Sequence, residues 1–255
     1  MIIWFSLVLS CMSAFSAPHI VIGKDSRVQI LKHEDPILKT IGQVEFDTIE
    51  KKPNGGFKRN ACTGTLITKR HVITNGHCVT ASNKYPSPLT KIESLTFSPG
   101  RLKGYEIPLG QFKVKQIHTF KRWIMKGDIK WDVAVLTLDR DAYDPEVSVD
   151  EFRESDFRKG EKLHVIGYPG DKPDGTLWKG DGTFLKVESN GNVIQHSVDT
   201  YSGTSGSLLM KRIGNVWVPI GVHRGSQSGI FNDYNTAVMF NSEIIRYIRK
   251  WTSQD

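Results

Sequence analysis

Residues 62–78, CTGTLITKRHVITNGHC, decide the fold, because they combine two short strand patterns with two cysteines. GTLIT and HVITN are short apolar segments rich in β-branched residues, which favour strands. The second segment runs into a polar turn that carries His77 directly before Cys78. We therefore expect a β-rich fold in which this turn holds a histidine in a fixed position.

The same strand pattern recurs along most of the chain. Glycine, proline and asparagine separate the segments at KPNGG, YPSP, YPGDKPDG and SNGN. The other predicted strands are RVQIL, SLTFSPG, FKVKQIH, VAVLTL, KLHVIGY, TFLKVES, VIQHSV, GSLLM, VWVPIGVH and AVMF. About a dozen strands with few helical patterns predict an all-β barrel or sandwich.

One segment near the end of the chain, NSEIIRYIRKW, has a clear helical pattern. Its apolar residues fall on one face of a helix, and they are Ile244, Ile245, Ile248 and Trp251. Asn241 or Ser242 can cap the first turn. We predict a C-terminal helix here.

The N-terminus, MIIWFSLVLSCMSAFSA, has the pattern of a secretory signal peptide. Its apolar core runs from Ile2 to Leu9, whereas about 20 apolar residues are needed to span a bilayer. Small residues follow, which places cleavage near residues 16 and 17. The composition of the full chain, 38% hydrophobic and 24% charged, is typical of a soluble globular protein. We predict a secreted, soluble protein without a membrane partner.

The net charge is +7, from 34 basic and 27 acidic residues. Such a charge favours solubility and attracts acidic partners. The basic residues are scattered along the chain, and no zinc-finger, basic-zipper or RNA-binding signature occurs. We therefore predict no nucleic-acid partner.

Of the three cysteines, Cys11 would leave with the signal peptide. In an oxidising compartment Cys62 and Cys78 are expected to form one disulfide. Closing a loop of about 16 residues contributes roughly 3 kcal/mol in the chain-entropy model. A metal site is the alternative, which two cysteines without a C-x-x-C motif do not favour. We predict no metal, and a calcium site stays open because no acidic loop stands out.

Hydroxyl side chains surround Ser205 in VDTYSGTSGSLLM, residues 198–210. A serine becomes a nucleophile only when an oriented base takes its proton. His77 is the candidate base because it follows an apolar strand in a polar turn. Asp132 is the candidate carboxylate because it begins an apolar strand, where an acidic residue must be paired.

The order His77, Asp132, Ser205 resembles that of the chymotrypsin-like serine proteases. TNGHC resembles their histidine motif, DVAVL their aspartate motif and GTSGS their nucleophile motif. The two cysteines match the disulfide that brackets the histidine loop in that family. The resemblance covers about residues 21–251, and it implies two six-stranded antiparallel β-barrels followed by a C-terminal helix.

The polar stretch DRDAYDPEVSVDEFRESDFRKG separates two β-rich halves. The predicted domains are therefore a signal peptide over 1–17, an N-terminal barrel over 18–145 that contains the histidine and aspartate, and a C-terminal barrel over 146–255 that contains the serine and the helix.

The resemblance implies that Ser205 attacks a peptide carbonyl while His77 moves the proton and Asp132 orients the imidazole. The backbone N–H groups of Gly203 and Ser205 would bind the oxyanion. An α/β-hydrolase fits poorly, because its nucleophile elbow is G-x-S-x-G and its order is serine, acid, histidine.

Thr204 precedes the nucleophile at the place where pancreatic-type proteases carry the aspartate that switches their zymogens on. GYPGDKPDGTLW, VDTYSGTSGS and IGVHRG instead resemble the secreted bacterial glutamyl endopeptidases. In that subgroup Thr200 and His223 match the residues that receive a glutamate side chain, and Ser226 matches a further pocket position. Val21 matches the mature N-terminus, whose amine helps to bind the carboxylate.

The resemblance implies a secreted serine endopeptidase that cleaves after glutamate, and more slowly after aspartate because one methylene is worth about 1–3 kcal/mol. A protease of the same fold with another specificity is one alternative. A non-catalytic homologue that binds polyanions is the other, although such proteins normally lack a triad residue. We expect protein or peptide substrates, no cofactor and a monomer.

Overall fold

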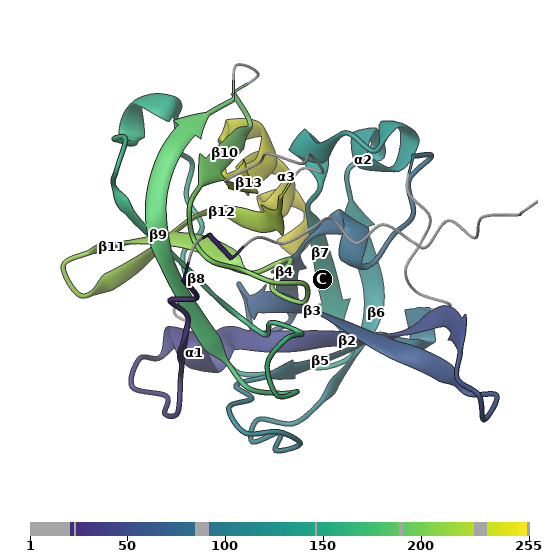
Figure 1. Cartoon of the computed structure of the whole chain (residues 1–255). Coiled ribbons are helices and arrows are strands. Elements are labelled where there is room, and N and C mark those ends of the chain that lie inside the picture. Colours follow the sequence, from purple (N-terminus) through teal and green to yellow (C-terminus); the bar gives the residue numbers. More distant parts are fainter. Residues whose placement is uncertain are drawn as a thin grey trace, which may run out of the picture.

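Two closed antiparallel β-barrels follow one another along the chain in the computed structural model (Figure 1). The structure describes residues 21–22, 24–84, 92–145, 147–188, 191–226 and 234–253. The predicted signal peptide lies outside these residues. Within them, no helix is long and apolar enough to cross a membrane.

Six strands form the first barrel. They are β2 (Ile41–Lys51), β3 (Phe57–Leu66), β4 (His71–Thr74), β5 (Thr96–Pro99), β6 (Phe112–Thr119) and β7 (Ala134–Leu138). Their closed order is β2-β3-β4-β7-β6-β5, so the last pairing, between β5 and β2, completes the barrel.

Six further strands form the second barrel. They are β8 (Lys162–Gly167), β9 (Trp178–Val187), β10 (Val193–His196), β11 (Leu208–Ile213), β12 (Val216–Gly225) and β13 (Asn235–Met239). The order is β9-β10-β13-β12-β11-β8, and pairing of β8 with β9 closes it. The short strand β1 (Val28–Gln29) pairs with the start of β9 and so adds the N-terminal segment to this sheet.

Short helices connect the strands, and one longer helix ends the chain. They are α1 (Ile37–Thr40), α2 (Lys121–Lys126), α3 (Ser242–Thr252) and the 3-10 helices η1 (Gly76–Cys78), η2 (Ile92–Ser94), η3 (Ile129–Trp131) and η4 (Glu154–Asp156). The prediction of two six-stranded barrels with a C-terminal helix is confirmed. The domain boundary that we predict between residues 145 and 146 falls in the connection from β7 to β8.

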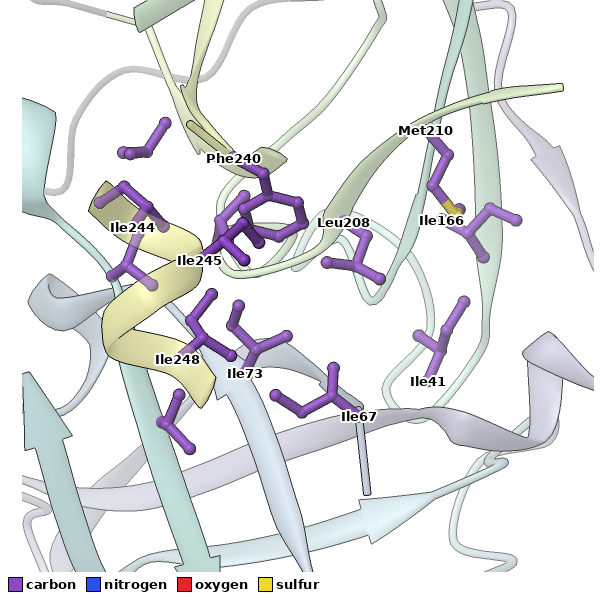
Figure 2. Close-up of a cluster of buried hydrophobic side chains, with 14 of the residues drawn as sticks. Ile41, Ile67, Ile73, Ile166, Leu208, Met210, Phe240, Ile244, Ile245 and Ile248 are labelled. Atoms are coloured by element: carbon purple, nitrogen blue, oxygen red, sulfur yellow. The ribbon is translucent and has the colours of Figure 1, made fainter. Parts of the chain in front are cut away.

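The main hydrophobic core lies between the barrels and under α3. Ile73 of the first barrel and Leu208 of the second both belong to it, and both are 1% exposed or less. Ile245 and Ile248 point from α3 toward the same cluster (Figure 2). Because fully burying one such side chain is worth about 1.5–3 kcal/mol, this shared core fixes how the barrels sit against each other.

The N-terminus of α3 is capped as its sequence predicts. The Asn241 side chain accepts a hydrogen bond from the backbone N–H of Ile244 at 2.9 Å. Asn241 also donates to the side chain of Asn192 at 2.6 Å, which ties the start of the helix to the second barrel.

Strand β2 is not among the predicted strands. Val44 and Phe46 point into the first barrel, but Gln43, Glu45 and Asp47 alternate with them and make the segment read as polar. Gln43 is nevertheless 4% exposed, because Arg101 donates to its side-chain oxygen. Polar partners from another element, which a local pattern cannot reveal, therefore stabilise this strand.

Candidate active site

His77 and Asp132 come from the ends of neighbouring strands of the first barrel. His77 lies in η1, directly after β4, and Asp132 ends η3, directly before β7. The ladder between β4 and β7 pairs Thr74 with Ala134. This pairing places the loop that follows β4 beside the loop that precedes β7. The sheet register therefore brings together two side chains that are 55 residues apart in the sequence.

Two hydrogen bonds join these residues. The Nδ1–H of His77 donates to Oδ2 of Asp132 at 2.7 Å, and its backbone N–H donates to Oδ1, also at 2.7 Å. Gly76 permits this approach, because a Cβ there would lie 2.8 Å from the Trp123 ring and 3.2 Å from Oδ1 of Asp132. The carboxylate thus fixes the ring orientation and leaves Nε2 for proton transfer.

Asp132 is fully buried and is held by a second charged group. Nε of Arg224 lies 3.0 Å from Oδ2, the oxygen that also accepts from the His77 ring. Burial alone would raise the pKa of the Asp132 carboxyl, but His77 and Arg224 together lower it below its usual value. The carboxylate is therefore negative at neutral pH.

Ser205 lies in the loop between β10 and β11, in the second barrel, and faces the first. Its backbone carbonyl accepts from the N–H of Thr63 on β3 at 2.8 Å, which docks the loop across the barrel interface. Its hydroxyl, 3% exposed as a residue, donates to the carbonyl of Arg224 at 3.2 Å. Arg224 thus touches the candidate aspartate with its side chain and the candidate nucleophile with its backbone.

Gly203 has the geometry expected beside an oxyanion site. Its φ of +97° is in the region that favours glycine, and a Cβ there would lie 2.4 Å from the carbonyl of Tyr168. Within the described ranges, no hydrogen bond from the N–H of Gly203 or of Ser205 is found. Both donors are therefore available to a ligand oxygen.

The disulfide between Cys62 and Cys78 joins β3 to η1, the element that carries His77. It restrains the histidine loop from its C-terminal side. The two sulfur atoms and a ring nitrogen of His77 lie within 4.8 Å of one another. This group does not fit a metal centre, because the disulfide uses both thiols.

The three residues that we predict for the specificity pocket lie in the second barrel, and all are fully buried. Thr200 follows β10, whereas His223 belongs to β12 and Ser226 follows it. The hydroxyl oxygens of Thr200 and Ser226 are buried without a hydrogen-bond partner in the described part of the chain. Buried hydroxyls rarely lack a hydrogen-bond partner, and two such hydroxyls in the second barrel indicate a place for a polar ligand.

A second histidine supports His223. Nε2 of His196, at the end of β10, lies 3.2 Å from Nδ1 of His223. Burial lowers the pKa of His196 to about 3, against the opposite effect of the Thr236 carbonyl. His196 is therefore a neutral imidazole at any working pH, a role that its strand-like sequence context does not indicate.

The N-terminal segment is anchored next to Thr200. Oδ1 of Asp199 accepts from the N–H of Ile22 at 2.8 Å, and Oδ2 accepts from the N–H and hydroxyl of Ser26 at 3.0 and 2.6 Å. This anchor brings Val21, the predicted mature N-terminus, close to the candidate pocket. Our sequence reasoning missed Asp199 and Arg224, although each is a charged residue directly beside a predicted pocket residue.

Two barrels with an Asp–His pair and a serine loop at their interface define the class of protein: a serine endopeptidase of the chymotrypsin-like fold. The chain belongs to the trypsin-like peptidase family, since the model of the trypsin-like peptidase domain matches residues 62–219. The contacts of the serine loop, the disulfide beside His77 and the family match all support this assignment.

Two curated relatives are each 25% identical to the chain. One is an extracellular metalloprotease of Bacillus subtilis, aligned over 93% of this chain and 71% of its own length. The other is a glutamyl endopeptidase of Staphylococcus aureus, aligned over 78% of this chain. The chain spans 55% of the length of the staphylococcal relative.

Solved structures share the fold. A Glu endopeptidase structure in complex with MPD superposes with a TM-score of 0.73 at 21% identity, covering 92% of this chain and 100% of that one. The protease Anisep of Arthrobacter nicotinovorans superposes with a TM-score of 0.64 at 16% identity, covering 87% of this chain and 98% of that one.

Proposed function

We propose that the protein is a secreted endopeptidase that cleaves peptide bonds after glutamate and, more slowly, after aspartate. His77, Asp132 and Ser205 form the catalytic triad, and Thr200, His223 and Ser226 receive the acidic side chain. Secretion follows from the predicted signal peptide, and the disulfide suits an oxidising compartment.

In the acylation step, Oγ of Ser205 attacks the carbonyl carbon of the scissile bond while Nε2 of His77 takes the hydroxyl proton. The hydroxyl must first leave the Arg224 carbonyl and turn toward the imidazole. The carbonyl oxygen becomes an oxyanion that accepts hydrogen bonds from the N–H groups of Gly203 and Ser205. His77 then gives its proton to the leaving amine, and the C–N bond breaks.

In the deacylation step, a water molecule replaces the amine. His77 takes a proton from the water, and the hydroxide adds to the acyl carbon. When the intermediate collapses, the ester bond to Ser205 breaks and the proton returns to Oγ. Asp132 stays ionised throughout and stabilises the imidazolium, which its low pKa and its two bonds to His77 support.

The observation that carries the glutamate preference is the pair of buried, unpartnered hydroxyls at Thr200 and Ser226. A carboxylate accepts such hydrogen bonds, and charge-assisted bonds are about twice as strong as neutral ones. The relative from Staphylococcus aureus, which is named a glutamyl endopeptidase, supports the same assignment. No acidic residue takes the place of Thr200, which disfavours a preference for a substrate lysine or arginine.

Cleavage before Val21 would create an amine one residue from the Asp199 anchor. A positive amine held there would add the charge that the uncharged hydroxyls lack. We therefore propose that removal of the preceding residues raises activity toward glutamate.

Mapping cut sites in a casein digest by mass spectrometry tests this function. Protein that begins at Val21 should cut after glutamate, Ser205→Ala should abolish the cuts, and Ser202→Ala, a loop control, should keep them. Cuts after other residues, lost in Ser205→Ala, would establish the alternative of another specificity. No cleavage by folded, trimmed protein, together with binding to heparin, would favour the polyanion-binding homologue.

A further inference from the structure

His196 and His223 form a buried pair of imidazoles in the second barrel. Both side chains are fully buried, and the ring of His196 touches that of His223 from the neighbouring part of the barrel. The backbone N–H of Val198 donates to Nδ1 of His196 at 3.2 Å. That nitrogen is therefore an acceptor and carries no proton.

A neutral imidazole has one N–H, so the proton of His196 must be on Nε2. This N–H points to Nδ1 of His223 at 3.2 Å and makes that nitrogen an acceptor as well. The proton of a neutral His223 is then on Nε2. A second proton on Nδ1 of His223 would oppose the N–H of His196 across the same short distance.

We propose that His196 is a positioning residue that holds His223 as a neutral Nε2–H donor, so that the pocket meets the substrate carboxylate with a donor of fixed direction and no charge. This inference rests on the proposed function. The inference adds to that function that a group other than His223 selects a charged side chain over an amide. The new N-terminal amine is the candidate for that group.

The charged groups around His223 agree with this assignment. Arg224, the next residue, turns its side chain to Asp132. Asp199 is occupied by the N-terminal segment. The neighbouring residues on β11 and β13 are apolar or neutral, and His196 is a titratable group in contact with the ring.

The test compares two peptides that differ only in glutamate or glutamine before the scissile bond. The ratio of their kcat/KM values is measured from about pH 5.5 to 7, where the glutamate is ionised and an α-amino group keeps its charge. A neutral His223 predicts a ratio that is constant within about twofold. A ratio that falls about tenfold or more as the pH rises would show a titrating imidazolium and overturn the inference.

His196→Gln gives the matched perturbation, because its amide oxygen can turn to Nδ1 of His223 and accept a proton from it. The ratio for this variant should be about tenfold higher at pH 5.5 than at pH 7. A ratio as flat as that of the wild type would overturn the role of His196. His164→Gln, which removes a histidine bonded to Asp181 on the same barrel, is the control and should behave as the wild type.

Two further observations separate failure of the proposed function from failure of this inference. If the wild type shows no preference for glutamate at any pH, the proposed function itself fails, and this inference fails with it. If His196→Gln does not fold, nitrogen NMR of the wild-type imidazoles decides. A His223 ring protonated at Nε2 alone over the same pH range supports the inference, and a doubly protonated ring contradicts it.

Discussion

Replacing Arg224 by glutamine tests whether its charge tunes the catalytic pair. Nε of Arg224 and Nδ1 of His77 contact the same oxygen of Asp132, at 3.0 and 2.7 Å. The two cationic groups would therefore be at most about 6 Å apart when His77 is protonated. At an effective dielectric of about 20, their repulsion is about 3 kcal/mol.

This repulsion opposes protonation of the imidazole, and only the neutral imidazole can take the serine proton. Because His77 is 28% exposed, solvent screening reduces the full value, which corresponds to about two pH units. Arg224→Gln keeps a donor to Asp132 but loses the charge. We expect the acidic limb of the kcat/KM profile to move about one pH unit upward.

Arg224→Lys keeps the charge and should leave the acidic limb within a few tenths of a pH unit of the wild type. Losing one partner of a buried ion pair can cost about 3–5 kcal/mol of stability, so the profiles are measured well below the melting temperature of each variant. If Arg224→Gln lowers kcat equally at every pH and leaves the limb in place, the charge has no catalytic role and the reasoning is wrong.

Three further predictions follow from single contacts. Replacing Cys62 and Cys78 by serine should lower the free energy of unfolding by about 3 kcal/mol, the cost expected for a loop of 16 residues; unchanged urea denaturation would contradict it. Asn241→Ala should cost about 1 kcal/mol and roughly 2–4 °C in melting temperature, while Asn241→Ser keeps the cap acceptor and should lose less. Thr200→Val should leave thermal stability equal or higher but lower kcat/KM for glutamate peptides about tenfold or more, since the buried hydroxyl has no partner in the described structure; an unchanged kcat/KM would exclude Thr200 from the pocket.

Much of the fold could be predicted from local pattern. β4 and β7 are short apolar strands, and α3 has a one-sided apolar face with a capping asparagine. The number of barrels and their closure came from the family resemblance, because strand patterns do not say which strands pair. β2 was not predicted, because its polar residues have hydrogen-bond partners on distant elements, such as Arg101 for Gln43.

The candidate site also contains residues that could be predicted from the sequence and residues that could not. His77 and Asp132 could be found because each lies at a strand end in a motif, and the register of β4 and β7 then brings them together. Arg224 could not be found, because a basic residue in a strand is usually on the solvent face. Nothing in the local sequence shows that its side chain turns inward to Asp132.

Strand irregularities explain why alternation fails here. The register between β12 and β13 shifts between His223 and Gly225, at Arg224 itself, and the register between β10 and β9 shifts between Gln195 and His196. In a regular strand His223 and Arg224 would face opposite sides, yet both are buried. A bulge adds a residue and re-aims the side chains beside it. These two shifts therefore place a histidine against the candidate pocket and an arginine against the candidate triad, from strands whose sequences show neither.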